Sequence, residues 1–251
     1  MAEWLSQQVG QRISRQAIGW WLKKLGITRK KLTYHYTQLD EVKAKAFNEE
    51  IKLLLDKFPF IVLDECSFYP KLDPRFGYSL KGTRAVERKP SHKGDEHCAL
   101  FFAISNLKEN GVIHWELTKE RVNWETFYNF LEKINPIGDK KNYLIMDNAS
   151  IHDVPDKRKE KKLPNVREQM LEKNIEIKFI TTYAPMLNPT ELIFCLLRQQ
   201  TEKQRPRNYE ELENAIKKVV ELLNTKDLSK YFWHCANYFD HNDKKSKLKL
   251  L

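Results

Sequence analysis

The chain has 251 residues, 41% of them hydrophobic, which is enough for one sizeable domain with its own core and a small additional one. Its formal net charge is +10, so attraction to polyanions is expected, although many soluble proteins are also basic. The sequence lacks a long apolar run, a signal-peptide pattern and any CxxC pair among its four cysteines, which argues against a membrane span, secretion, and a zinc or disulfide framework.

Residues 1–35 are expected to form a basic helical unit. A helix tail at residues 2–5 and a turn at Val9-Gly10 precede a second helix, which Ser14 caps and Gly26 ends. A helix-turn-helix needs this layout, because its second helix enters the major groove of DNA while flanking cations meet phosphates. A solvated basic hairpin packed on the main domain is the alternative. The candidate DNA-binding residues are Arg12, Arg15, Lys23, Lys24, Arg29, Lys30 and Lys31.

A connecting helix is predicted over residues 40–57. Asp40 is a suitable N-cap, and apolar residues recur at helical spacing. The residues expected to face inward are Val42, Ala46, Phe47, Ile51 and Leu54.

The main domain that follows alternates between strand and helix patterns, which predicts a mixed sheet with helices on its faces. The residues between 153 and 165 are charged and contain two prolines, so an exposed loop is expected there. Strands are predicted at 60–63, 82–88, 97–104, 112–117, 143–146 and 175–180. Helices are predicted from 124 to 134 with Asn123 as cap, from 166 to 173, from Pro189, and from Asn208 or Tyr209.

Three acidic residues lie at junctions between these elements. Asp64 follows the apolar run 60–63, Asp147 follows 143–146, and Glu191 lies in the first turn of a helix that Asn188 caps. Sites in α/β sheets form at the carboxyl ends of strands. Three carboxylates brought together repel one another unless a cation lies between them, and an oxygen-only ligand set favours Mg²⁺ or Mn²⁺. These are the ions of phosphoryl transfer, so the pattern suggests chemistry on polynucleotides.

Four sequence blocks in one order support a family resemblance. Each block alone is a modest signal, but the series resembles the DDE transposases of the mariner superfamily, including its bacterial insertion-sequence branch, from about residue 1 to residue 225. The blocks are Ile61–Phe68, Arg75–Gly82, Met146–His152 and Tyr183–Glu191. The resemblance implies an RNase H-like sheet, whose first strand, fourth strand and a late helix carry the acidic triad, preceded by a small all-α helix-turn-helix segment.

The resemblance also implies a reaction. Phosphodiester hydrolysis at transposon ends would be followed by strand transfer, with two Mg²⁺ or Mn²⁺ ions held by Asp64, Asp147 and Glu191. Asp64 would bridge both ions, and the other two residues would each hold one. The implied partner is double-stranded DNA, both terminal inverted repeats and target, bound by a homodimer in a bacterial cytoplasm or a eukaryotic nucleus. Two hypotheses compete with this one: a catalytically idle or domesticated DNA-binding protein derived from a transposase, and a structure-specific nuclease of the same fold, which the Asn188-Pro189-Thr190-Glu191 block matches less well.

Two features depart from the family pattern. Family members usually begin with two helix-turn-helix units, whereas this chain is expected to start inside the second one. In addition, 43 residues separate Asp147 from Glu191, more than is common, and the charged segment at 153–165 accounts for the excess.

Several neighbours of the triad have two possible roles. Glu65 should point away from Asp64, because side chains alternate along a strand. His152 is expected to be a loop histidine satisfied by the backbone, with contact to phosphate or a ligand as the alternative. Residues 183–189 should form the turn that aims Glu191. Basic residues of the segment after the first strand would either line a DNA path or belong to an ordinary basic hairpin: Arg75, Lys81 and Arg84.

These patterns divide the chain into four parts. A partial helix-turn-helix region is predicted at 1–35, a connecting helix at 36–58, an RNase H-like catalytic domain at 59–205, and a C-terminal helix with a basic tail at 206–251.

Overall fold

The computed structural model describes residues 2–28, 37–70, 77–86, 97–149, 152 and 165–240. Within it the chain forms two compact units, Met1–Thr37 and Gln38–Leu251. In the described part of the chain, no helix is both long enough and apolar enough to cross a membrane. The segment at 153–164 and four of the predicted basic residues lie outside the described residues: Arg29, Lys30, Lys31 and Arg75.

The first unit contains two helices joined by a tight turn. Helix α1 (Ala2–Val9) is followed by Gly10, whose φ of +69° suits a residue without a side chain. The turn is fastened to α1 because the Ser6 hydroxyl accepts a hydrogen bond from the Ile13 N–H. Helix α2 (Arg15–Lys24) begins as predicted at Ser14, whose side chain accepts from the Ala17 N–H.

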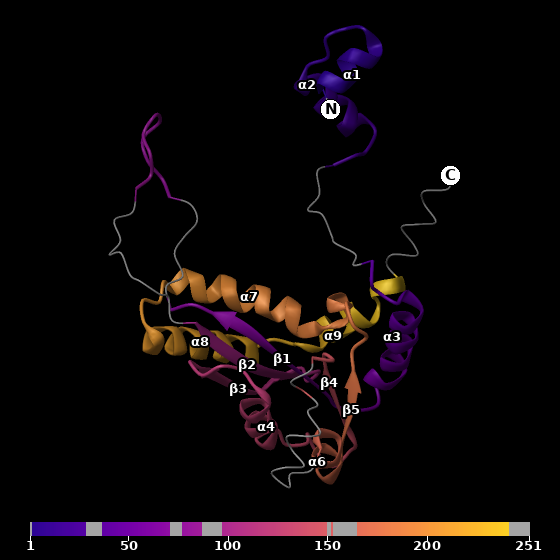
Figure 1. Ribbon diagram of the computed structural model, residues 1–251, viewed down its shortest axis with the longest axis vertical. Coiled ribbons are helices and arrows are strands. Elements are labelled where there is room, and N and C mark those ends of the chain that lie inside the picture. The colour runs from indigo at the N-terminus through magenta and orange to yellow at the C-terminus, as the bar shows by residue number, and fades with distance from the viewer. Residues whose placement is uncertain are drawn as a thin grey trace. The chain divides into compact units, whose positions relative to one another are not determined.

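The second unit is built on a five-stranded sheet in the order β3-β2-β1-β4-β5 (Figure 1). Strands β3, β2 and β1 pair antiparallel, whereas β1, β4 and β5 pair parallel, so the sheet is mixed as predicted. The strands are β1 (Phe60–Phe68), β2 (Cys98–Ser105), β3 (Val112–Thr118), β4 (Asn142–Met146) and β5 (Ile175–Phe179).

Helices cover both faces of this sheet, with α7 and α8 on one side and α4 and α6 on the other (Figure 1). The core is accordingly divided into two clusters, and alternate residues of β1 enter each of them: Phe60 and Val62 enter one, Ile61 and Leu63 the other. The helices are α3 (Glu41–Leu55), α4 (Trp124–Glu132), α6 (Val166–Glu172), α7 (Pro189–Gln204), α8 (Tyr209–Asn224) and α9 (Ser229–Ala236).

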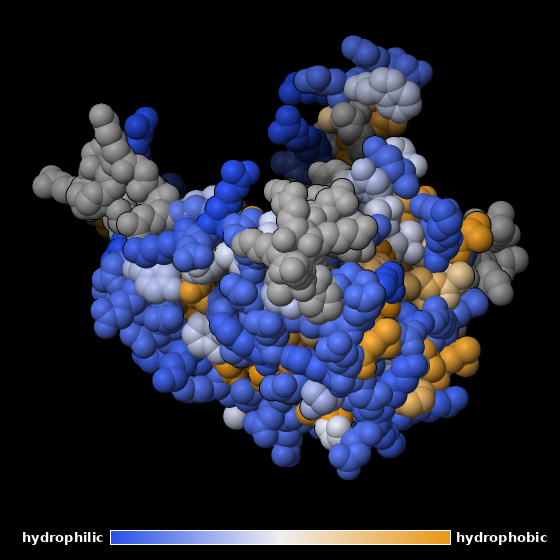
Figure 2. All heavy atoms as spheres, turned by 60° about the horizontal axis from the view of Figure 1, so that its bottom comes forward, coloured by the Kyte–Doolittle hydropathy of each residue, from blue (hydrophilic) through white to orange (hydrophobic). Residues whose placement is uncertain are grey.

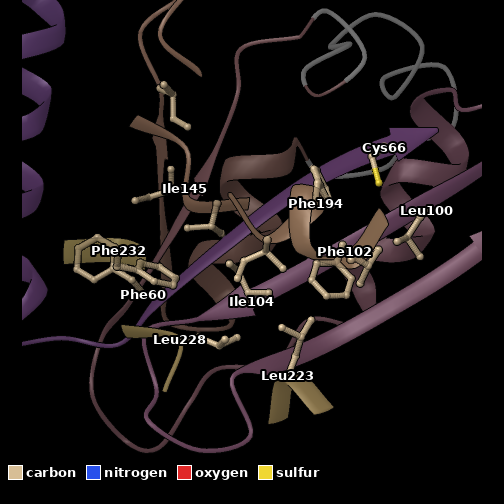
Figure 3. Packing of buried hydrophobic residues seen from close by; sticks show 14 of the residues in the cluster. Phe60, Cys66, Leu100, Phe102, Ile104, Ile145, Phe194, Leu223, Leu228 and Phe232 are labelled. Atoms are coloured by element: carbon tan, nitrogen blue, oxygen red, sulfur yellow. The ribbon is translucent and has the colours of Figure 1, made fainter. Parts of the chain in front are cut away.

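The cluster under α7 and α8 is the larger one and rigidly connects the late helices to the strands. Figure 3 shows Phe194 of α7 and Leu223 of α8 directed toward Phe102 and Ile104 of β2. Phe232 of α9 packs in the same cluster. The opposite face, with α4 and α6, presents a mostly hydrophilic surface with scattered apolar residues (Figure 2).

Two predictions about local structure were wrong. Residues 82–86 form no strand: Gly82 has a φ of +88° and Thr83 donates its N–H to the Leu80 carbonyl, so the segment turns. The inward face of α3 was wrong at two positions, since Val42 is 79% exposed and Ala46 is exposed, whereas Ile51 is buried and Phe47 and Leu54 pack against the core as predicted. The buried face of α3 consists of Ala44, Asn48, Ile51 and Leu55.

The polar residue Asn48 explains why the buried face of α3 differs from the predicted one. Its side-chain amide donates to the Ala236 carbonyl at the end of α9, at a distance of 2.8 Å, in the buried interface of the two helices. A buried amide is tolerated because it is hydrogen-bonded, but apolar periodicity does not count it as an inward position.

Candidate active site

Asp64 lies inside β1 rather than at its end, because β1 continues to Phe68. The expectation that Asp64 terminates its strand was therefore wrong. The parallel ladder to β4 does end before it, with Val62 opposite Ile145 as the last pair, while the antiparallel ladder to β2 continues through Asp64. Asp64 thus lies in the part of β1 that extends past the last residue pair with β4.

The other two acidic residues lie where the sequence predicted. Asp147 directly follows β4, which ends at Met146. Glu191 is the third residue of α7, after Pro189 at the first position, and Asn188 caps the helix by accepting from the Thr190 N–H. The turn before α7 also forms as expected: Tyr183 adopts a φ of +61°, and a short 3₁₀ helix, η1, spans Pro185–Leu187.

All three carboxylate residues line one cavity of about 310 Å³. The rest of its wall comes from the residues after β4, from the turn after β5 and from the cap of α7: Asn148, Ala149, Ile180, Thr181, Thr182, Tyr183, Ala184, Pro185 and Asn188. The cavity is therefore lined by carboxylate residues from three separate elements, and it lies where β4 ends beside β1. In the described part of the chain, no three His, Cys, Asp or Glu side chains already form a compact metal-ligand group.

The carboxylate of Asp64 is held by the beginning of α7. Its Oδ2 accepts hydrogen bonds from the Asn188 side-chain amide at 2.8 Å and from the Thr190 hydroxyl at 3.0 Å. Its Oδ1 accepts from the backbone N–H of Glu65 at 2.8 Å. Burial nevertheless raises the pKa of Asp64 to about 7, and the neighbouring charges of Glu65 and Asp147 add to this shift.

Asp147 is held by a different partner, His152. The His152 Nδ1 lies 2.9 Å from Asp147 Oδ1, and the Ala149 N–H donates to the same oxygen. These hydrogen bonds lower the pKa of Asp147 below its usual value. Asp64 and Asp147 thus face one cavity while each is bound to its own set of donors.

His152 makes the backbone contact expected of it and two further contacts that were not predicted. Nδ1 donates to the Asp147 carbonyl at 3.0 Å in addition to the carboxylate, while Nε2 lies 3.1 Å from Glu65 Oε1. The ring is 1% exposed, yet its acceptors raise the pKa of His152 to about 10 against the opposing effect of burial.

Glu65 points away from the triad cavity, as strand alternation predicted. It lines a second cavity of about 720 Å³ together with residues of β1, β2 and the segment before α4. The remaining lining residues are Cys66, Ser67, His97, Ala99, Lys119, Glu120, Arg121 and Val122.

The described basic candidates are exposed. In the first unit, Arg12 lies in the turn before α2, Arg15 opens that helix, and Lys23 and Lys24 are in its last turn. Lys24 is additionally placed over the rings of Trp20 and Trp21, with its Nζ 5.1 and 5.0 Å from their centroids. In the second unit, Lys81 and Arg84 are exposed in the turn segment at 77–86.

Comparison with known families gives two matches along the chain. Residues 59–213 match the model of the DDE superfamily endonuclease. Residues 1–51 match the model of the winged helix-turn helix. No curated protein matches the sequence.

Solved structures of one transposase resemble most of the chain. The mariner Mos1 paired-end complex with Mg is 21% identical with a TM-score of 0.63, and the alignment covers 94% of this chain and 70% of that chain. The Mos1 paired-end complex with left transposon end gives 20% identity and 0.62 over the same shares. The Mos1 catalytic domain alone gives 18% and 0.50, with 81% and 92% covered.

Proposed function

The chain belongs to the DDE superfamily of endonucleases and has the fold of a mariner transposase, and we propose that it is a DNA transposase that cuts phosphodiester bonds with Asp64, Asp147 and Glu191. The observation that carries the proposal is the single cavity that these three residues line. Acidic residues on three elements would not be collected at one edge of a sheet, against their mutual repulsion, without a cation to bind.

The donor set fits a hard divalent cation. Only oxygen ligands are offered by the three carboxylates, which suits Mg²⁺ or Mn²⁺ better than zinc. When bound, two such ions would activate the attacking oxygen and stabilise the departing one. The Mos1 paired-end complex has been solved with Mn and with Mg, which supports the same choice of metal here.

The chain's own residues would orient these oxygens. Asn188 and Thr190 fix the carboxylate of Asp64 through its Oδ2, so α7 and β1 are joined at the site. Glu191 follows on the same helix turn and is exposed, which leaves its carboxylate accessible from the solvent side. Asp64, Asp147 and Glu191 would together hold the ions.

The first unit would bind the DNA. It resembles a helix-turn-helix, and α2, whose exposed cations lie at both ends, would enter the major groove. The Mos1 complexes are described as paired-end, pre-cleavage and strand-transfer assemblies. We therefore propose that this chain binds the terminal inverted repeats of an element as a homodimer and joins them to target DNA. We propose that the chain is divided accordingly into a DNA-binding region at 1–35, a connecting helix at 36–58, a catalytic domain at 59–205 and a C-terminal helix with a basic tail at 206–251.

The test is cleavage of duplex DNA with Mg²⁺ or Mn²⁺ by the wild type, by Asp147→Asn and by Asp139→Asn, a control in an exposed loop. We expect Asp147→Asn to abolish cleavage and to bind DNA as tightly as the wild type or slightly more tightly, because one negative charge near the phosphates is removed. The control should cleave normally. Cleavage by Asp147→Asn would contradict the proposal.

The same preparation distinguishes the competing functions. A domesticated DNA-binding protein would retain DNA affinity but would not nick DNA at any divalent-ion concentration. A nuclease without transposase activity would nick DNA but would not join the released 3′ end to a second duplex. We expect both nicking and joining.

A further inference from the structure

His152 connects Glu65, which is on β1, with Asp147, which directly follows β4. It lies five residues after Asp147 and 87 residues after Glu65, and its ring nitrogens contact a carboxylate of each. The imidazole is also stacked on Phe127, with the ring centroids 4.2 Å apart. The His152 ring is therefore held in place by packing as well as by its hydrogen bonds to Asp147 and Glu65.

These contacts determine which oxygen of Asp147 remains available. Oδ1 receives the His152 Nδ1 at 2.9 Å and the Ala149 N–H at 3.1 Å. Among the described residues, no donor is placed on Oδ2. Asp147 lines the triad cavity. Of its two carboxylate oxygens, Oδ2 is therefore the one that these donors leave for an ion.

Glu65 provides the anchor for this arrangement. It directly follows Asp64 on β1, but its side chain lies on the other face of the sheet. One rigid strand thus carries Asp64 toward the cavity and, through Glu65 and His152, sets the position of Asp147. The separation between the carboxylates of Asp64 and Asp147 is then fixed before any ion binds. Hydrogen bonds to metal-binding side chains commonly serve to orient them in this way.

On the premise of the proposed function, we propose that His152 is a positioning residue that, anchored by Glu65, holds Asp147 so that its Oδ2 faces the cavity shared with Asp64 and Glu191. His152 itself binds neither ion nor DNA. Loss of this contact should weaken metal binding while leaving DNA affinity unchanged.

The test compares His152→Phe, His152→Asn, Glu65→Gln and a matched control, His114→Phe. Phenylalanine retains the stacked ring without hydrogen bonds, whereas asparagine retains a donor near the position of Nδ1. His114 is also a histidine on the sheet, with Nε2 2.7 Å from Glu116 and its ring centroid 5.1 Å from that of Phe130, but it does not touch the triad.

The readouts are Mn²⁺ binding by electron paramagnetic resonance without DNA, DNA affinity, and the Mn²⁺ dependence of cleavage. We expect His152→Phe and Glu65→Gln to raise the Kd for Mn²⁺ by about 10–100-fold, with a smaller loss for His152→Asn. A double variant that combines Glu65→Gln with His152→Phe should bind Mn²⁺ no more weakly than His152→Phe alone, because both changes break the same chain of contacts. The control should match the wild type.

Failure of this inference is distinguishable from failure of the function. If the wild type cleaves, Asp147→Asn does not, and the folded His152 and Glu65 variants bind Mn²⁺ normally, the positioning role is refuted while the function stands. If the wild type neither binds Mn²⁺ nor cleaves, the function itself is refuted. Should His152→Phe not fold, Glu65→Gln and His152→Asn still decide the question by the same criterion.

Discussion

The carboxyl group of Asp64 should make the stability of the protein depend on pH. Its pKa is raised to about 7 in the folded chain, mainly by burial. In an unfolded chain the group titrates near its ordinary value of about 4. Between these values the folded protein retains a proton that the unfolded chain has lost, so the free energy of unfolding falls as pH rises, and the full penalty is present above about pH 7.

We therefore predict that Asp64→Asn gains stability relative to the wild type between about pH 4 and about pH 8 in the presence of a chelator. The gain is at most a few kcal/mol, since each unit of pKa difference corresponds to about 1.4 kcal/mol. The asparagine loses one hydrogen bond with Glu65, a cost of about 1 kcal/mol that does not depend on pH. Thermal melting at several pH values measures the difference.

Asp227→Asn is the control for this experiment. Hydrogen bonds from Ser229 lower the pKa of Asp227, so its contribution changes only in the acid range below the pH window used. An Asp64→Asn curve parallel to that of the wild type from acid to alkaline pH would show that Asp64 is ionised like an ordinary surface carboxylate.

At the scale of single residues, the sequence predicted the positions of the three proposed catalytic carboxylates better than the contacts that hold them. Asp147 and Glu191 adjoin local signals, an apolar strand and a capped helix start, which a sequence displays directly. The donors on Asp64 come from α7, more than 120 residues away, and the ion pair between His152 and Glu65 spans 87 residues. Only tertiary structure brings such residues together.

At the scale of elements, the N-cap of α7 has two roles that can be separated. Asn188 accepts from the Thr190 N–H as a cap and also donates to Asp64. Asn208, the cap of α8, accepts from the Glu211 N–H at 2.9 Å. It is not among the residues that line the triad cavity. We expect either substitution by alanine to destabilise the protein by about 1 kcal/mol.

Only Asn188→Ala should also impair metal-dependent cleavage, because it removes a donor from Asp64. Chemical denaturation and a Mn²⁺ titration of cleavage give the two measurements. If Asn208→Ala lost cleavage to the same extent, the effect of Asn188 would be one of stability alone.

Helix starts were predicted well because they depend on local chemistry. Ser14, Asp40, Asn123 and Asn188 all cap the helices expected of them, and α8 begins at Tyr209, one of the two starts predicted for it. Helix α9 was not predicted separately, since its N-cap position is Leu228, which makes no side-chain cap hydrogen bond. The strand expected at 82–88 was wrong in its described part, where a turn centred on Gly82 prevails over the apolar pattern.

At the scale of the whole molecule, the first unit should make DNA binding sensitive to salt. Arg15 and Lys23 lie at opposite ends of α2 and are exposed. Each phosphate contact that is lost should make the slope of log affinity against log salt less steep by about 0.9. We expect this change for Arg15→Ala and Lys23→Ala, measured by fluorescence anisotropy with duplex DNA at several salt concentrations.

Lys218→Ala, an exposed lysine on α8, serves as the control for general charge. An equal change of slope in the control would show that binding reflects net charge rather than the helix-turn-helix.

The overall topology could be predicted only partly from the sequence. The order of strand and helix patterns indicated a mixed sheet, and the hairpin of β2 and β3 followed from their proximity along the chain. The order β3-β2-β1-β4-β5 did not follow, because β1 pairs with β4 across about 80 residues of chain. Strand patterns alone do not specify such long-range pairing; the family resemblance implied it.

The most direct test of the account is the position of bound Mn²⁺ in crystals, located by its anomalous scattering. We predict a peak in the cavity between β1, β4 and α7, within coordination distance of carboxylate oxygens from Asp64, Asp147 and Glu191, and its loss in Asp147→Asn. A peak elsewhere on the protein, or a peak in the cavity that Asp147→Asn leaves unchanged, would contradict the account.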